Sequence, residues 1–149
     1  MDILFGTYPS WSLMIVRLGL GVIFFAHGSQ KVFGWFGGHG LKGTIGYFQQ
    51  SLQIPPALGA LAALGELLGG LGMLVGFLSR PAALGLIVSM LVAISKVHWP
   101  NGFFLNWEMQ PGKGHGFEMN LALIAMALAI FVGGGGVLSI DRLIAPWGN

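Results

Sequence analysis

The residue with the clearest chemical potential in this sequence is Glu66, a carboxylate in the middle of an apolar run. Residues 56–78 contain no other charged side chain, and a run of this length can cross a bilayer as a helix. A charge at the centre of a membrane costs about 2.5–3.5 kcal/mol on insertion scales, so it normally faces a protein interior and serves a function. Glu66 is therefore a candidate for binding a polar group or for transferring protons.

Other ionisable side chains also lie in hydrophobic segments or at their ends. They are Arg17, His27, Lys31, Lys96, His98 and Glu118. Together with Glu66 they form a predicted buried polar site, in which Glu66 and His27 are the candidates for proton transfer. His27 and Lys31 are one helical turn apart and could hydrogen-bond a quinone carbonyl or an anion. Equally, Lys31 could extend to the membrane surface while His27 binds a backbone carbonyl.

The composition predicts an integral membrane protein. Of the 149 residues, 54% are hydrophobic and 8% are charged, whereas soluble domains carry roughly 25% charged residues. The net charge of +2 is too small to indicate nucleic-acid binding. The chain has no cysteine, which excludes disulfides, iron–sulfur ligation by thiolates and thiolate zinc sites. No two histidines have the spacing of a helical metal site, so neither a metal nor an intrinsic redox cofactor is predicted.

Four hydrophobic segments are predicted to be membrane helices of a single all-α bundle that includes the whole chain, residues 1–149. They cover about residues 11–33, 56–78, 81–99 and 117–136. The connection after the first helix is long, and its apolar residues recur at helical spacing. These residues are Leu41, Ile45, Phe48 and Leu52. The pattern predicts a short helix that lies at the membrane surface.

Helical periodicity predicts that the charged side chains converge in the bundle interior. At 100° per residue, Arg17, His27 and Lys31 share one face of the first helix, and that face also carries glycine. The faces of Glu66, Lys96 and Glu118 are likewise rich in small residues, which let membrane helices pack closely. His98 points away from Lys96 unless Pro100 ends the third helix early.

This convergence leaves two interpretations of Glu66 open. In the first, Glu66 is the floor of a polar vestibule that gathers all four histidines at one membrane face. In the second, Glu66 forms a buried ion pair with Arg17 or Lys96 that only fixes the register of the helices. The glycine run at residues 133–136 has no phosphate-binding context and is interpreted as a flexible helix end.

The sequence resembles the DoxX family over nearly its whole length. The stretches that carry the resemblance are residues 17–21, 24–34, Glu66 with 69–72, His98 with 101–104, 116–118 and 133–141. The resemblance implies a small four-helix protein of the bacterial inner membrane. Some DoxX-like proteins are subunits of a thiosulfate:quinone oxidoreductase, and others are linked to membrane complexes that respond to oxidative stress. More distant relatives act in disulfide chemistry, which the absence of cysteine argues against here.

Two functional hypotheses follow. In the first, the protein is the membrane subunit of a quinone-linked oxidoreductase whose redox cofactor lies on a partner subunit. In the second, it is a non-enzymatic scaffold, a lipid-binding protein or a small-solute transporter. Expected partners are membrane lipid, a quinone, and a redox subunit or a second copy of the chain. Both termini are expected in the cytoplasm, because Arg80 and Arg142 flank the helices on that side.

Overall fold

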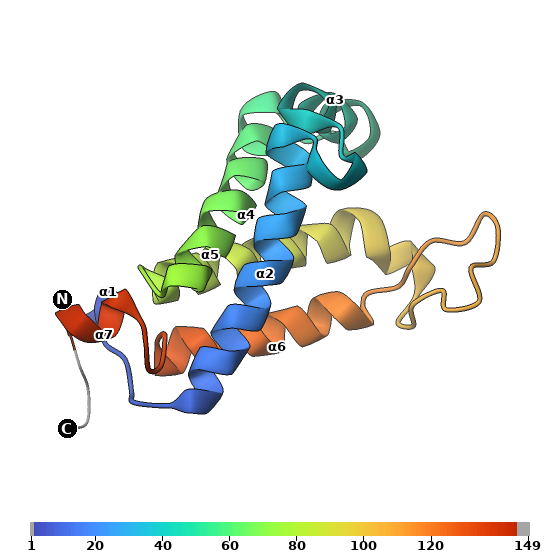
Figure 1. Cartoon of the computed structure of the whole chain (residues 1–149). Coiled ribbons are helices and arrows are strands. Elements are labelled where there is room, and N and C mark those ends of the chain that lie inside the picture. Colours follow the sequence, from blue (N-terminus) through green and yellow to red (C-terminus); the bar gives the residue numbers. More distant parts are fainter. Residues whose placement is uncertain (1, 146–149) are drawn as a thin grey trace.

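The structure, a computed structural model, describes residues 2–145 and is built from helices (Figure 1). The four long helices are α2 (Trp11–Phe33), α4 (Pro56–Val75), α5 (Ser79–Ala93) and α6 (Glu118–Gly133). Short helices α1 (Asp2–Phe5) and α7 (Ile140–Ile144) lie near the two termini. The predicted all-α membrane bundle is confirmed. Its second helix ends earlier than predicted because Gly76, in the left-handed conformation, terminates α4.

The third predicted helix does not stay regular to residue 99. After α5 the chain forms a π turn, η2 (Ile94–His98), and then a 3-10 turn, η3 (Trp99–Asn101). Pro100 has no N–H to donate, and in a regular helix its ring would collide with the carbonyl of Lys96. The irregular turns relieve this conflict, so the helical path continues to Asn101 with altered side-chain directions.

Within the described residues, three helical segments are long and apolar enough to cross a membrane. They are Trp11–Phe33, Pro56–Val75 and Ser79–Asn101. The fourth bundle helix, α6, is apolar but has 16 residues, fewer than the roughly 20 that a perpendicular crossing needs. Gly134, at φ 80°, ends α6, so the glycines do not extend the helix to residue 136 as predicted.

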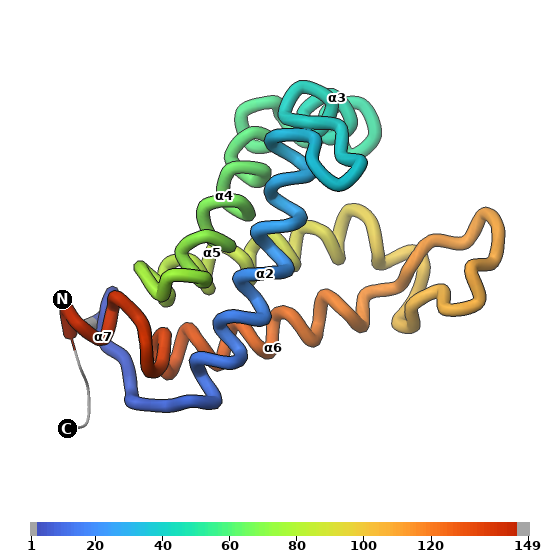
Figure 2. The backbone as a smooth tube through the Cα atoms, in the orientation of Figure 1, coloured from blue at the N-terminus to red at the C-terminus, as the bar shows by residue number. Residues whose placement is uncertain are grey.

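The four long helices pack as two pairs, α2 with α4 and α5 with α6. Contacts between α4 and α5 and between α2 and α6 join the pairs. Figures 1 and 2 show the pairs meeting near the termini and diverging away from them. Helix α3 (Gly40–Leu52) covers the far end of the α2–α4 pair, whereas the connection at 102–117 extends from the α5–α6 pair. The predicted single vestibule with all four histidines is therefore wrong.

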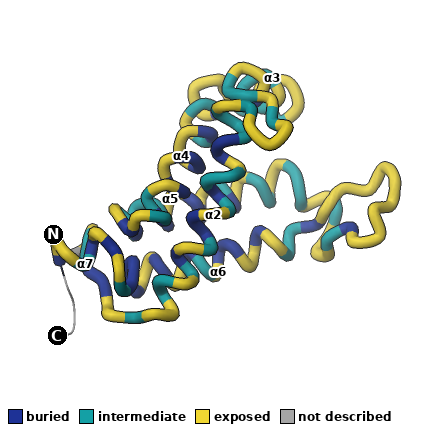
Figure 3. Tube along the Cα trace, viewed as in Figure 1, coloured by how far each residue is buried: buried dark blue, intermediate teal, exposed yellow. Residues whose placement is uncertain are grey.

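The α2–α4 contact is a direct approach of two helix backbones. A β-carbon at Gly28 would overlap the backbone of Leu67, and one at Gly70 would overlap the backbone of Phe25. Only glycine permits this separation, as in other close membrane-helix crossings. Figure 3 shows the buried positions concentrated where the helices face one another. The largest apolar side chains of this core include Leu20, Phe24, Met73, Leu86 and Ile130.

The helix predicted in the first long connection is confirmed as α3 (Gly40–Leu52). It is tied to the end of α2 by Thr44, whose hydroxyl donates a hydrogen bond of 3.0 Å to the carbonyl of Lys31. The polar side chains of this segment, such as Lys42, Gln49 and Gln50, are exposed. The side of α3 that carries Thr44 therefore faces the end of α2 and lies beside Lys31.

We predict that Gly70→Ala destabilises the protein, because the added methyl group would force the backbones of α2 and α4 apart. Overpacking of this kind costs about 1–3 kcal/mol. Gly65→Ala on the same helix is the matched control, since a β-carbon there would meet open space and alanine favours the helix. The free energies of unfolding of both variants can be measured by denaturing titration in mixed micelles. Equal stability of the two variants would contradict the backbone contact.

Candidate polar site

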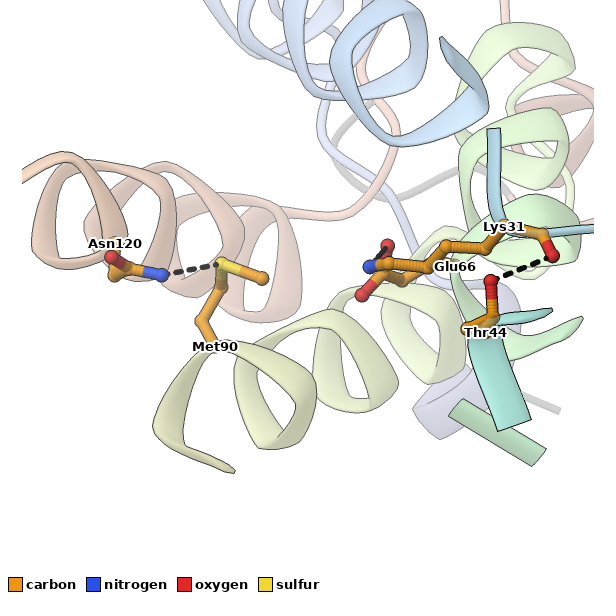
Figure 4. Close-up of polar contacts among 5 residues, drawn as sticks. All are labelled: Lys31, Thr44, Glu66, Met90 and Asn120. Atoms are coloured by element: carbon orange, nitrogen blue, oxygen red, sulfur yellow. Dashed lines mark hydrogen bonds and ion pairs between the residues drawn. The ribbon is translucent and has the colours of Figure 1, made fainter. Parts of the chain in front are cut away.

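Lys31 and Glu66 form an ion pair between α2 and α4 (Figure 4). The Lys31 ammonium donates to Oε2 of Glu66. The Glu66 side chain is 7% exposed and the Lys31 side chain is 27% exposed. Gly28 packs on Leu67, the residue next to Glu66, so the close helix crossing places Lys31 within reach of the carboxylate. The pair is thus buried on the carboxylate side and open on the ammonium side.

The partner of Glu66 differs from the two partners predicted for an ion pair, Arg17 and Lys96. Lys96 is exposed on the π turn after α5, and Arg17 is bound elsewhere. His27 is also exposed, so its predicted interior position is wrong. Gly28 lies on the buried face of α2. Around the circumference of a regular helix, His27 lies about 100° from Gly28, farther from it than Lys31 on the same side. His27 is therefore at the edge of the arc that periodicity alone had assigned to the interior.

An open groove of about 810 Å³ lies beside Lys31, between the end of α2 and helix α3. It is lined by Gln30, Lys31, residues 37–39, Gly43, Thr44, residues 46–48, Gln50 and Ser51. The lining combines hydrogen-bonding groups with the aromatic rings of Tyr47 and Phe48. A β-carbon at Gly46 would have no heavy atom within 4 Å, so the groove is open there. Periodicity could not predict this groove, because it depends on how α3 folds back onto α2.

Arg17 is buried, with an exposed fraction of 1%, but it does not approach Glu66. Its Nε donates to the carbonyl of Gly135 at 2.8 Å, and its Nη2 donates to Leu138 at 3.1 Å. Its Nη1 donates to the carbonyls of Met73 and Leu74. These last two carbonyls belong to the final turn of α4, where carbonyls lack helical partners and favour a cation. Arg17 therefore joins α2, α4 and the C-terminal segment and is not available to a ligand.

The glycine run at 133–136 is a buried connection, and its interpretation as a flexible end is wrong. All four glycines are buried, and the N–H of Gly136 donates to the hydroxyl of Thr7 at 2.8 Å. Gly134 has a positive φ, and a β-carbon there would overlap the carbonyl of Gly6. The run turns tightly between α6 and α7 and brings the C-terminal segment back into the bundle.

Asp141 anchors this segment and was not identified from the sequence as a functional or structural residue. Its two carboxylate oxygens accept hydrogen bonds of 2.8 Å from the N–H groups of Leu78 and Ser79, at the start of α5. The free N–H groups of a helix start favour a negative partner. The signal in the sequence was an acidic residue just after a serine that could begin a helix, and Ser139 does cap α7.

Glu118 and His98 bind the long connection at 102–117 and do not join Glu66. Oε1 of Glu118 accepts hydrogen bonds from the N–H of Leu105 at 3.1 Å and from the indole of Trp107 at 3.3 Å. Nδ1 of His98 donates to the carbonyl of His115 at 2.8 Å. Their predicted convergence with Glu66 is wrong because the α5–α6 pair diverges from the α2–α4 pair at this end (Figure 1).

Asn120 is a buried polar residue that sequence reasoning missed. Its Nδ2 donates to the sulfur of Met90 at 3.3 Å (Figure 4), and a thioether is a weak acceptor. A β-carbon at Gly69 would lie 3.2 Å from the side chain of Leu86. This contact packs α4 against α5. The Asn120–Met90 hydrogen bond thus joins α6 to α5 inside the bundle.

Residues 2–145 contain no group of three histidine, cysteine or acidic side chains arranged to hold a metal ion. The functional candidate that the geometry supports is the Lys31–Glu66 pair with its groove. Of the seven residues predicted for one polar site, the structure brings together only these two.

The apolar helices and the buried charges define a multi-pass integral membrane protein of the small helical-bundle class. Within that class, residues 12–99 match the DoxX family, which is more than half of the chain, and the protein belongs to this family. The matched region contains Arg17, Lys31 and Glu66. Comparisons with curated proteins and with solved structures gave no match.

We predict that Arg17→Met lowers the free energy of unfolding by about 3 kcal/mol or more, because it removes the donors of four carbonyls at once. Arg17→Lys should recover only part of this loss, since an ammonium lacks the planar fork of a guanidinium. Lys113→Met, at an exposed loop position, is the control for loss of a cation. The free energy of unfolding of each variant can be measured by tryptophan fluorescence during denaturation in mixed micelles. Wild-type stability of Arg17→Met would show that the hydrogen bonds of Arg17 do not hold these segments together.

Proposed function

We propose that this protein is the membrane subunit of a quinone-linked oxidoreductase or oxidative-stress complex. The Lys31–Glu66 pair and its groove would form the polar site for a quinone headgroup and its protons. The supporting observation is an ionisable pair within apolar helices that opens, on the lysine side, toward a groove. Ionisable side chains are costly inside membranes and commonly mark functional sites.

The groups around the groove suit a quinone headgroup. The Lys31 ammonium and the Gln30 amide can donate hydrogen bonds to a carbonyl oxygen, and Tyr47 and Phe48 offer ring faces. Reduction of a quinone to a quinol takes up two electrons and two protons. We propose that a redox centre on a partner subunit provides the electrons and that Glu66 and Lys31 hold and transfer protons. His27 is exposed and is not included in this site.

The second candidate is a non-enzymatic membrane scaffold. It is favoured by the fact that Lys31 and Glu66 satisfy one another, as a pair that only fixes helix register would do. Replacing a buried ion pair with apolar residues of similar size is often neutral for stability. The pair can therefore be removed without unfolding the protein, so that its effect on quinone binding can be measured separately from its effect on stability.

We predict that protein purified in mild detergent retains quinone and that Glu66→Gln and Lys31→Met each lower the bound amount at least about tenfold, the effect of losing about 1.4 kcal/mol. The double variant Lys31→Met/Glu66→Leu should also lose quinone while remaining close to wild-type stability. Glu108→Gln, in the exposed part of the 102–117 connection, is the control. Lipid extraction and chromatography measure the quinone, and thermal denaturation measures stability.

The groove can be tested separately from the ion pair. Gly46→Phe should fill the open space and reduce bound quinone, whereas Gly46→Ala should leave it unchanged. Wild-type protein that is purified without any bound quinone would favour the scaffold.

We further propose that the protein lies in the bacterial inner membrane with both termini in the cytoplasm. Arg80 lies on the terminal side, where its guanidinium donates to the carbonyls of Gly6 at 2.8 Å and Val132 at 2.7 Å. Arginine near helix ends is enriched on the cytoplasmic side. Green fluorescent protein fused after Asn149 should therefore fluoresce, and alkaline phosphatase at the same position should be inactive. The opposite pair of results would invert the topology.

A further inference from the structure

A second hollow lies at the other end of the molecule, where the C-terminal segment meets the end of α4. It has a volume of about 460 Å³ and is lined by Val75, Leu138, Ser139, Ile140, Arg142 and Leu143. Apart from Ser139, its lining consists of one guanidinium and aliphatic side chains. It has no part in the quinone site proposed above.

The Arg142 guanidinium lacks the partners that other arginines of the protein have. Its Nη1 is buried and has no hydrogen-bond partner among the described residues. The adjacent carboxylate of Asp141 makes no ion pair with it and instead accepts hydrogen bonds from the start of α5. Arg17, by contrast, donates to four carbonyls. The Arg142 side chain as a whole is only partly buried and lines the hollow. It therefore presents there a positive charge that forms no ion pair among the described residues, so the hollow is suited to an anion.

The border of the hollow is strongly apolar and faces outward. Leu143 is 85% exposed and Leu138 is 75% exposed. On α4, the exposed side chains of Leu68, Leu71 and Val75 continue this apolar surface along the membrane-crossing helix. Such side chains are favourably placed against acyl chains at the membrane boundary. The hollow therefore presents a cation directly beside a surface for hydrocarbon chains.

We propose that this hollow binds an anionic phospholipid, with Arg142 on the phosphate and Leu138, Leu143 and Val75 on the acyl chains. A guanidinium can donate two parallel hydrogen bonds to a phosphate, which makes arginine a preferred phosphate partner. The apolar border distinguishes a lipid from a free phosphate ion, which would gain nothing from the leucines. The attraction of basic groups at a membrane surface to anionic lipids acts in the same direction.

Native mass spectrometry of delipidated protein in detergent can test this assignment. Wild-type protein should bind phosphatidylglycerol more tightly than phosphatidylcholine, and Arg142→Gln should weaken phosphatidylglycerol binding about tenfold, the effect of losing a charge-assisted hydrogen bond. Lys113→Gln removes the same charge from the distant 102–117 connection and should change the affinity less than twofold. Leu143→Gln should weaken binding of the lipid without creating affinity for inorganic phosphate.

Three outcomes would overturn the proposal. They are unchanged phosphatidylglycerol affinity in Arg142→Gln, equal affinity of wild-type protein for both lipids, and displacement of the lipid by inorganic phosphate with Leu143→Gln behaving as wild type. The last outcome would identify free phosphate as the ligand. If Arg142→Gln does not fold, as judged by circular dichroism, Arg142→Lys replaces it. This variant keeps the charge but loses the fork, so a several-fold weaker affinity supports the site and an unchanged affinity overturns it.

Discussion

The contact on which the rest of this structure depends is the backbone approach of α2 and α4 at Gly28 and Gly70. Inside a membrane the hydrophobic effect does not draw helices together, so close packing and polar contacts must do so. The crossing brings Lys31 to Glu66 on one side of Gly28. On the other side it brings Arg17 to the last carbonyls of α4. Two polar arrangements at different depths therefore result from one pair of glycines.

The end of the bundle near the termini is held by two buried charged side chains that bind backbone groups. Arg17 binds carbonyls from α4 and from the C-terminal segment, while Asp141 binds the first N–H groups of α5. The glycine run makes both contacts reachable, since it returns the chain into the bundle directly after α6. Helix ends carry unpaired backbone groups that are costly to bury. Here the cation Arg17 binds the carbonyl end of α4, and the anion Asp141 binds the N–H end of α5.

The sequence predicted the parts of this fold that hydrophobic length and helical period determine. The bounds of α2, the presence of α3 and the burial of Arg17 and Glu66 follow from those patterns. The partner of Glu66 could not be predicted in this way. Helical periodicity shows which face of a helix is buried, but it gives neither the crossing angle nor the depth of the helix that packs against that face. For the same reason, His27 was predicted to be in the interior although it lies at the edge of the buried face and is exposed. Glu118 was misplaced because nothing in its own helix reveals that the helix pairs diverge.

The two cations of α2, Arg17 and Lys31, differ in a way that matches their surroundings. Arg17 keeps its proton at any physiological pH, so it can anchor carbonyls permanently but cannot release a proton to a ligand. Lysine as a residue type gives up its proton far more readily than arginine, which is why lysine and not arginine occurs as a proton donor in protein sites. A lysine at the groove and an arginine bound to carbonyls are thus the residue types expected if the Lys31–Glu66 pair exchanges protons and Arg17 serves only to hold the helices together.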